Sequence, residues 1–208
     1  RVVKYCLDTK DLGLRFEPVP LRHRSPNCKW ELVVYSDSDW GADVDTRKSI
    51  TGVAVFFMGC LVSWTSKQQS IVALSSAELE YYALGEAAKS IKFIYQLLQD
   101  MCIPVKTPII CRVDNKAAIF MVENVNTTPR TRHIDIKHRW IGQLVEEGFL
   151  KILFVASAEN LSDGFTKNIG PELLTKHSSN CLAPRPVDAD EEEEAPNEPA
   201  RPVVVETV

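Results

Sequence analysis

Apolar and polar residues follow a strand-like pattern in the first third of the chain. Between Trp30 and Ser36 the side chains alternate in character, which predicts a strand that ends at Ser36. Residues 51–59 and 60–68 are two further β-rich runs, separated by the turn-forming Gly59. Their spacing predicts a hairpin, and the first strand is expected to join it in an antiparallel meander.

The period of the pattern changes after residue 74. The pattern that follows predicts six elements in order: a helix (75–100), a strand (108–114), a helix (115–124), a helix (127–148), a strand (149–157) and a helix (157–169). Ser75 or Ser76 is suited to cap the first helix, and Gly148 is suited to end the third. Three antiparallel strands followed by β–α crossovers predict an α/β fold, in which a five-stranded mixed sheet carries helices on both faces.

Charge is distributed unevenly along the chain. The formal net charge is −4, but residues 177–208 contain two basic and eight acidic residues, and the other 176 residues contain 22 basic and 20 acidic ones. From Cys181 onward the sequence is also rich in proline. We therefore expect residues 177–208 to be an acidic, disordered tail. The near-neutral body neither requires nor excludes a nucleic-acid partner.

Length and composition exclude several classes of protein. With 208 residues, 45% of them apolar and 25% charged, the chain fits one ordinary globular domain with appendages. No apolar run approaches about 18 residues, so we expect no membrane-spanning helix. The first residues show no signal-peptide pattern, and no two of the six cysteines have CxxC spacing. Reduced thiols in an intracellular protein, not a secreted one, are the expectation.

Four carboxylates occupy positions at which a site can form. Asp37 follows the first predicted strand and Asp114 the fourth, while Glu78 lies in the first turn of the long helix and Asp163 comes after the fifth strand. Sites in open α/β sheets form beyond the carboxyl ends of the strands. If the first and fourth strands are parallel neighbours, these acids converge. The alternative is that each acid caps a helix or lies in solvent.

Converging carboxylates repel one another unless cations neutralise them. A set of oxygen ligands without Cys or His favours Mg²⁺, with Mn²⁺ also possible. Two such ions about 4 Å apart are suited to activate water and to stabilise the leaving oxygen at a phosphodiester. The acids therefore predict a site for two divalent metal ions.

Five blocks of sequence between about residues 30 and 170 are distinctive: SDSDW, SWTSKQQSIVALSSAELEY, VDNKAAI, RTRHIDI and FTK. Together they resemble the ribonuclease H domain of copia-type LTR retrotransposon polyproteins. Residues 1–27 resemble the segment that follows the reverse transcriptase in those polyproteins, together with a linker. We therefore predict a remnant and linker at 1–27, a ribonuclease H-like domain at 28–176 and the acidic tail at 177–208.

The resemblance implies a Mg²⁺-dependent endonuclease that cleaves the RNA strand of RNA–DNA hybrids by two-metal-ion hydrolysis. By position in the blocks, it assigns the catalytic, metal-binding roles to Asp37, Glu78, Asp114 and Asp163, with Asp37 bridging both ions. It also implies an RNA–DNA hybrid and an upstream reverse transcriptase of the parent polyprotein as partners. The location it implies is a cytoplasmic particle or the nucleus.

Two further acids are near alternatives to the assigned set. Asp39 lies two residues from Asp37 on the same strand, where side chains two apart point the same way. Glu80 lies two residues from Glu78 on a helix, about 200° around the axis, so only one of the two faces the site. Gly164 stands where the family usually has an apolar residue, and we expect it to weaken the last helix by up to about 1 kcal/mol.

Candidate substrate contacts are polar or basic residues close to these acids in the sequence: Ser75, Ser76, Asn115, Lys116, Arg130, Arg132 and His133. The two serines suit hydrogen bonds to ribose 2′-hydroxyls, which distinguish RNA from DNA. The helix that opens after Asp114 suits a phosphate at its N-terminus. The basic run suits phosphate contacts, and its alternative is a solvated helix face.

Two other functions compete with the nuclease. One is a catalytically inactive, nucleic-acid-binding remnant that keeps the fold, which the absence of visible polymerase motifs supports. The other is a retroviral-type integrase core, which shares the fold and the acid chemistry. The lack of an HHCC zinc module in the sequence weakens this second alternative.

Overall fold

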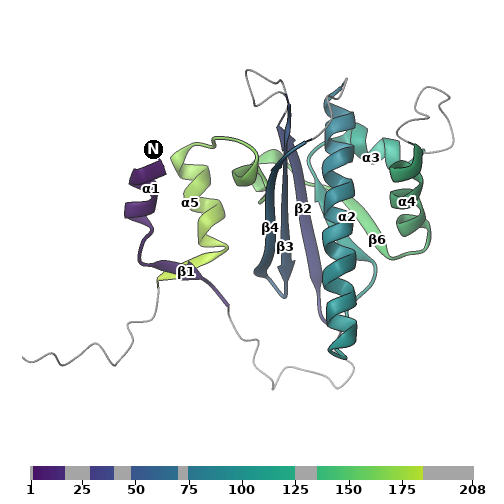
Figure 1. Ribbon diagram of the computed structural model, residues 1–208, viewed down its shortest axis with the longest axis horizontal. Coiled ribbons are helices and arrows are strands. Elements are labelled where there is room, and N and C mark those ends of the chain that lie inside the picture. Colours follow the sequence, from purple (N-terminus) through teal and green to yellow (C-terminus); the bar gives the residue numbers. More distant parts are fainter. Residues whose placement is uncertain (1, 17–28, 40–47, 70–74, 125–134, 185–208) are drawn as a thin grey trace, which may run out of the picture. The chain divides into compact units, whose positions relative to one another are not determined.

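The computed structural model describes residues 2–16, 29–39, 48–69, 75–124 and 135–184 and contains a five-stranded mixed sheet (Figure 1). Its strands are β2 (Leu32–Asp39), β3 (Ile50–Phe57), β4 (Cys60–Gln68), β5 (Ile109–Val113) and β6 (Leu150–Phe154). Their order is β4-β3-β2-β5-β6, and β2 pairs antiparallel with β3 but parallel with β5. The predicted fold class is confirmed.

The β3–β4 hairpin turns at two residues with positive φ. Met58 has φ 53° and Gly59 has φ 82°, which is the backbone of a two-residue turn whose twist matches that of its strands. The turn predicted at Gly59 is confirmed. Strand β2 runs three residues beyond the predicted end at Ser36, because Ser38 and Asp39 still pair with β3. Asp37 therefore lies inside a strand and not after it.

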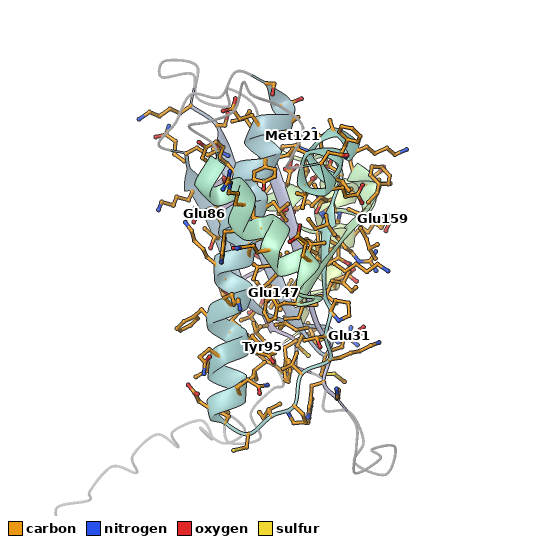
Figure 2. The ribbon with its side chains drawn as sticks, turned by 90° about the vertical axis from the view of Figure 1, so that its right-hand side faces the viewer. Glu31, Glu86, Tyr95, Met121, Glu147 and Glu159 are labelled. Carbon is orange, nitrogen blue, oxygen red and sulfur yellow. The ribbon has the colours of Figure 1, made fainter. Side chains whose placement is uncertain are left out.

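Three α-helices cover one face of the sheet: α2 (Ser76–Asp100), α3 (Lys116–Glu123) and α4 (Asp135–Glu146). The core beneath them contains Leu32, Val34, Val53, Val55, Cys111 and Val113 from the strands, and Leu84, Ala88 and Ile91 from α2. Figure 2 shows these helices with Tyr95 of α2 and Met121 of α3 labelled, both packed against this core. Within the described ranges, no helix is both long and apolar enough to cross a bilayer.

The predicted helix boundaries hold for α2 and α3 within a few residues. Ser75 is the N-cap of α2, and its Oγ accepts a hydrogen bond from the Glu78 N–H at 3.2 Å. Gly148 follows α4 with φ 68°, as expected for a helix-ending glycine. The first part of the predicted helix 127–148, up to residue 134, lies outside the described residues.

The predicted final helix over 157–169 is wrong. The segment instead forms two 3₁₀ turns, η3 (Ser157–Glu159) and η4 (Asp163–Phe165), next to a small apolar cluster on the second face of the sheet. The side chain of Asn160 accounts for the difference, because it ties the segment to β2 and takes up the Ser162 N–H, which a helix would pair within itself. Its Nδ2 donates to the Ser36 carbonyl at 3.1 Å, and its Oδ1 accepts from the Ser162 N–H at 3.3 Å.

The end of the described chain contains more regular structure than the sequence predicts. Helix α5 (Pro171–Ser179) includes the buried His177, and β7 (Leu182–Pro184) pairs with β1 (Leu12–Leu14), which follows α1 (Val2–Asp8). The first residues of the predicted tail therefore belong to a helix and a strand. The segment 185–208 lies outside the described residues, and the three predicted domain limits otherwise stay a prediction.

Candidate active site

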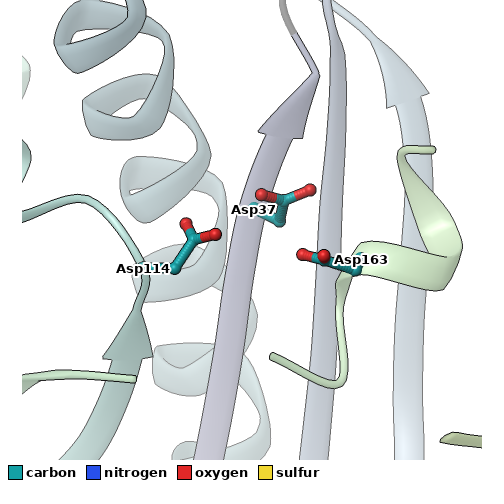
Figure 3. A group of neighbouring side chains, drawn as sticks. All are labelled: Asp37, Asp114 and Asp163. Atoms are coloured by element: carbon teal, nitrogen blue, oxygen red, sulfur yellow. The ribbon is translucent and has the colours of Figure 1, made fainter. Parts of the chain in front are cut away.

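Three aspartates from distant parts of the sequence meet beside β2, close to the point where β5 ends (Figure 3). Asp37 lies on β2, Asp114 directly after β5 and Asp163 at the start of η4, and one carboxylate oxygen of each lies within 4.8 Å of the others. The parallel register that pairs Ser36 with Val113 brings the first two together. The structure thus assembles three of the four acids singled out from the sequence, while their roles stay a prediction.

The acid that α2 brings to this group is Glu80, not Glu78. Glu80 is 6% exposed, and its Oε1 accepts a hydrogen bond from the Ser38 N–H at 3.4 Å. Burial and the charges of Asp37 and Asp114 raise the pKa of Glu80 to about 9. Because Glu80 lies one turn before Leu84, it shares the helix face that packs on the sheet.

The structure places Glu78, the helix acid singled out from the sequence, apart from the three aspartates. Glu78 is only half-buried, in the first helical turn behind the Ser75 cap. No pKa shift at Asp37, Glu80 or Asp163 has Glu78 among its causes. Two residues on a helix differ by about 200° in direction, so the burial of Glu80 turns Glu78 away. The other alternative, Asp39, is half-buried at the end of β2 and does not belong to the group of three aspartates.

The environment of the aspartates disfavours their ionised forms. Asp37 is fully buried, and burial raises its pKa against the opposing hydrogen bond of Thr166 and the charge of Lys167. Burial and the charge of Asp37 raise the pKa of Asp163 to about 6, again against Lys167. The group is therefore short of positive charge, even with a lysine beside it.

Thr166 and Lys167 are site residues that the sequence reasoning missed. The Thr166 hydroxyl donates to Asp37 Oδ2, and the Lys167 Nζ lies 3.2 Å from Asp37 Oδ1 and 3.3 Å from Asp163 Oδ1. Burial opposes the charged form of Lys167, but attraction by the two aspartates outweighs it and raises the pKa of the lysine. Both residues belong to the FTK block, and the i, i+4 spacing of Asp163 and Lys167 was the signal that could have found them.

A glycine on β3 lets the turn that carries these residues approach the strand. Gly52 pairs with Asp37 across the β2–β3 ladder. A Cβ atom at this position would lie 2.6 Å from the Thr166 Cγ2 and 2.9 Å from the Ser162 carbonyl oxygen. Only a residue without a side chain therefore permits Thr166 to reach Asp37 over this strand.

Two polar side chains hold the remaining acids in place. The Ser157 hydroxyl donates to Asp114 Oδ2 at 2.6 Å and so orients this carboxylate. Asn160 is fully buried and ties the segment before Asp163 to the Ser36 carbonyl on β2. The site is thus assembled from β2, α2, the end of β5 and the turns after β6.

Four of the seven candidate substrate contacts lie within the described residues. Ser75 caps α2, and Asn115 caps α3 by accepting hydrogen bonds from the N–H groups of residues 117 and 118 at 2.9 and 3.2 Å. Ser76 is exposed, and the Nζ of Lys116 lies 4.9 Å from the centre of the Phe154 ring. The basic residues Arg130, Arg132 and His133 lie outside the described residues. Substrate binding by all seven residues stays a prediction.

The residues at this site fit a hard divalent cation. Glu80 Oε2 is buried and accepts no hydrogen bond from any group in the part of the chain that the structure describes, and the buried Asp163 Oδ1 has the Lys167 ammonium beside it at 3.3 Å. All the charged ligands are carboxylate oxygens, the donors that Mg²⁺ and Mn²⁺ prefer. A cation bound there would favour the ionised carboxylates, which burial disfavours.

Solved structures with this architecture are ribonucleases H. LC11-RNase H1, isolated from compost by a metagenomic approach, is 17% identical and aligns with a TM-score of 0.50 over 70% of this chain and 96% of its own. The same enzyme in complex with an RNA/DNA hybrid gives 16% identity and a TM-score of 0.50 over 69% of this chain and 99% of its own. The fold is therefore that of a ribonuclease H-like domain.

Sequence relatives place this domain in a larger family. No family model matches the chain. The retrovirus-related Pol polyprotein from transposon TNT 1-94 of Nicotiana tabacum is 38% identical over 152 residues, which are 70% of this chain. The retrovirus-related Pol polyprotein from transposon RE2 of Arabidopsis thaliana is 29% identical over 167 residues, which are 80% of this chain. The chain covers 11% of the length of each. By sequence the chain is homologous to part of the retrovirus-related Pol polyproteins of plant transposons, and by fold it is ribonuclease H-like, in agreement with the resemblance to the ribonuclease H domain of copia-type elements.

Proposed function

We propose that the chain is a Mg²⁺-dependent endonuclease that cleaves the RNA strand of RNA–DNA hybrids within a retrotransposon Pol polyprotein. The observation that carries the proposal is the group of Asp37, Asp114 and Asp163, with Glu80 against it. The solved complex of LC11-RNase H1 with an RNA/DNA hybrid supports the choice of substrate class. A reverse transcriptase upstream in the parent polyprotein is the proposed partner, and a cytoplasmic particle or the nucleus is the proposed location.

Each acid has a distinct part in holding divalent ions. Asp37 lies between Asp114 on one side and Asp163 on the other, so it is the carboxylate suited to bridge two ions. Asp114 is oriented by Ser157, and Glu80 is oriented by the Ser38 N–H. Ions bound there supply an activated water and stabilise the leaving oxygen of the phosphodiester.

The protein's own residues supply positioning and the exclusion of water. Burial of Asp37, Glu80 and Asp163 fixes the directions of their carboxylates before a substrate arrives, which is the form of electrostatic stabilisation that accelerates reactions most. The exposed Ser75 and Ser76 at the start of α2 are the proposed contacts for ribose 2′-hydroxyls. Arg130, Arg132 and His133 are proposed to contact phosphates, together with Lys116 at the start of α3.

The direct test is cleavage of a hybrid whose RNA strand carries a label. The 208-residue chain should cut the RNA strand with Mg²⁺, leave the DNA strand intact and stop when EDTA removes the ion. Asp37→Asn should abolish cleavage and still give a folded circular-dichroism spectrum, because it removes a buried charge that is disfavoured in the metal-free protein.

The matched control is Glu86→Gln, on the same helix as Glu80 but paired with Lys89 away from the acids. It should cleave as the wild type does. Equal cleavage by the Asp37→Asn variant would overturn the assignment of the site. A wild-type chain that binds the hybrid and never cuts it would favour the inactive, nucleic-acid-binding remnant instead.

A further inference from the structure

The acidic site has two halves, which differ in whether a positively charged side chain lies beside their carboxylates. On one side, the Lys167 ammonium lies between Asp37 and Asp163, 3.2 and 3.3 Å from one oxygen of each. On the other side lie Asp114 and Glu80, and the Oε2 of Glu80 is buried without a hydrogen-bond donor in the described residues. Only the first half thus contains a cation supplied by the described part of the chain itself.

The ammonium occupies a position that a divalent ion bridging Asp37 and Asp163 would also require. Two cations cannot share the same carboxylate oxygens at such distances, because their mutual repulsion is largest where the surroundings exclude water. Binding of an ion on this side therefore requires Lys167 to leave.

The side chain of Lys167 is placed to leave without disturbing the turn that carries it. It is 34% exposed, whereas Asp37 and Asp163 are 1% and 6% exposed, so its flexible stem has a route to solvent. The neighbouring Thr166 keeps its own hydrogen bond to Asp37 Oδ2 and to the carbonyl of Asp163. This anchor leaves the turn in place when the ammonium moves.

We propose that Lys167 is a built-in, exchangeable cation that neutralises the Asp37–Asp163 half of the site until a divalent ion displaces it. The inference rests on the proposed metal-dependent function and adds a regulation of the same site. It makes the two halves unequal: an ion binds first on the Asp114–Glu80 side, and a second ion binds more weakly because it competes with the lysine.

The first test compares Mn²⁺ binding to the full chain, measured by the electron paramagnetic resonance of free Mn²⁺ during a titration. Lys167→Met keeps the length of the side chain and removes its charge, and it should tighten the weaker Mn²⁺ site about tenfold, since an ion pair no longer has to be broken. The matched control is Lys89→Met, which removes the same charge about 13 Å further along α2 than Glu80. Lys89→Met should bind Mn²⁺ as the wild type does.

The second test needs no substitution and so does not depend on whether Lys167→Met folds. Reductive methylation of the wild-type chain, read by mass spectrometry of its peptides, reports how accessible each lysine amine is. Labelling of Lys167 should rise severalfold as Mn²⁺ is added, while labelling of the exposed Lys89 should stay constant.

The outcomes separate this inference from the function on which it rests. Equal or weaker Mn²⁺ binding by Lys167→Met, or labelling of Lys167 that does not respond to Mn²⁺ in a protein that binds it, would overturn the exchange and leave the metal site standing. No Mn²⁺ binding by either protein would overturn both proposals. Tighter binding by the variant together with metal-dependent labelling supports the exchangeable lysine.

Discussion

The backbone N–H of Ser38 donates a hydrogen bond to Oε1 of Glu80 across 3.4 Å, which ties α2 to the strand that carries Asp37. The contact spans 42 positions of sequence and selects which of two neighbouring glutamates faces the acids. Because Glu80 is buried against Asp37 and Asp114, its charge is coupled to theirs. Glu78, half a turn away, is not among the charges that raise the pKa of Glu80.

Substitution of the two glutamates should therefore affect cleavage very differently. Glu80→Gln keeps a carbonyl oxygen for the Ser38 N–H but loses a charged ligand, and we expect Mg²⁺-dependent hybrid cleavage to fall at least about a hundredfold. Glu78→Gln makes the same chemical change two residues away on the same helix and should stay within about threefold of wild type. The measurement is the cleavage rate on a labelled hybrid. A larger loss in Glu78→Gln than in Glu80→Gln would return the assignment to the acid favoured by the sequence.

The raised pKa values predict how the metal-free protein responds to pH. Below the ordinary glutamate pKa of 4.5, Glu80 is protonated in both the folded and unfolded chains. Between that value and about 9, the unfolded chain loses a proton that the folded chain keeps, so the free energy of unfolding decreases as pH rises. Asp163 adds a similar decrease between its ordinary pKa of 3.8 and about 6.

Urea unfolding in EDTA at about pH 5 and about pH 8 should show this decrease in stability, with Glu80 contributing about 1 kcal/mol per pH unit over its window. Glu80→Gln should flatten the dependence and be more stable than wild type at the higher pH. Glu86→Gln, whose carboxylate pairs with Lys89 at the surface, should keep the wild-type slope. Adding Mg²⁺ should stabilise the wild type more at the higher pH, because the ionised acids bind it. The same slope in Glu80→Gln and wild type would contradict the coupling.

Much of this architecture was predictable from the pattern of the sequence. Alternation and hairpin spacing indicated β2, β3 and β4, and the strand-end positions of Asp37 and Asp114 implied that parallel strands would bring them together. These features depend on short-range periodicity and on sheet topology, which sequence patterns carry well.

What the sequence left open was set by contacts between distant segments. The choice of Glu80 over Glu78 depends on which helix face the sheet buries, and two residues of spacing cannot decide it without the helix's exact start. The helix predicted around Asp163 failed because the Asn160 side chain bonds across to β2, a contact 124 positions away. Lys167 enters the site through the same turn, so its i, i+4 spacing could indicate the pair with Asp163 but not the second pair with Asp37.

The basic run before α4 remains a prediction that binding can test. Replacing both Arg130 and Arg132 with Gln should weaken affinity for an RNA–DNA hybrid and lower the magnitude of the log–log salt slope by about one for each phosphate that the protein no longer binds. The double variant Lys89→Met with Lys92→Met removes the same charge from α2, where Lys92 lies over the Phe149 ring. The measurement is hybrid affinity at several salt concentrations with Ca²⁺ or EDTA to prevent cleavage. Equal slopes in the two double variants would show that the arginines form a solvated helix face.

Gly52 offers a test of how the Thr166 turn is held over Asp37. Gly52→Ala places a Cβ within 2.6 Å of Thr166 Cγ2 and 2.9 Å of the Ser162 carbonyl, so the turn must move away. We expect stability to fall by about 1–3 kcal/mol and hybrid cleavage to fall clearly, because the hydroxyl and Lys167 both shift from Asp37. Gly85→Ala is the control. Gly85 lies inside α2, and the atom of the described residues that a Cβ there would meet is Ile141 Cδ1 at 3.8 Å, so the helix should become slightly more stable.

Adding Thr166→Ser to Gly52→Ala removes the methyl that clashes and keeps the hydroxyl. It should restore part of both stability and cleavage, and an unchanged double variant would mean that the Ser162 carbonyl, not the threonine methyl, limits the approach.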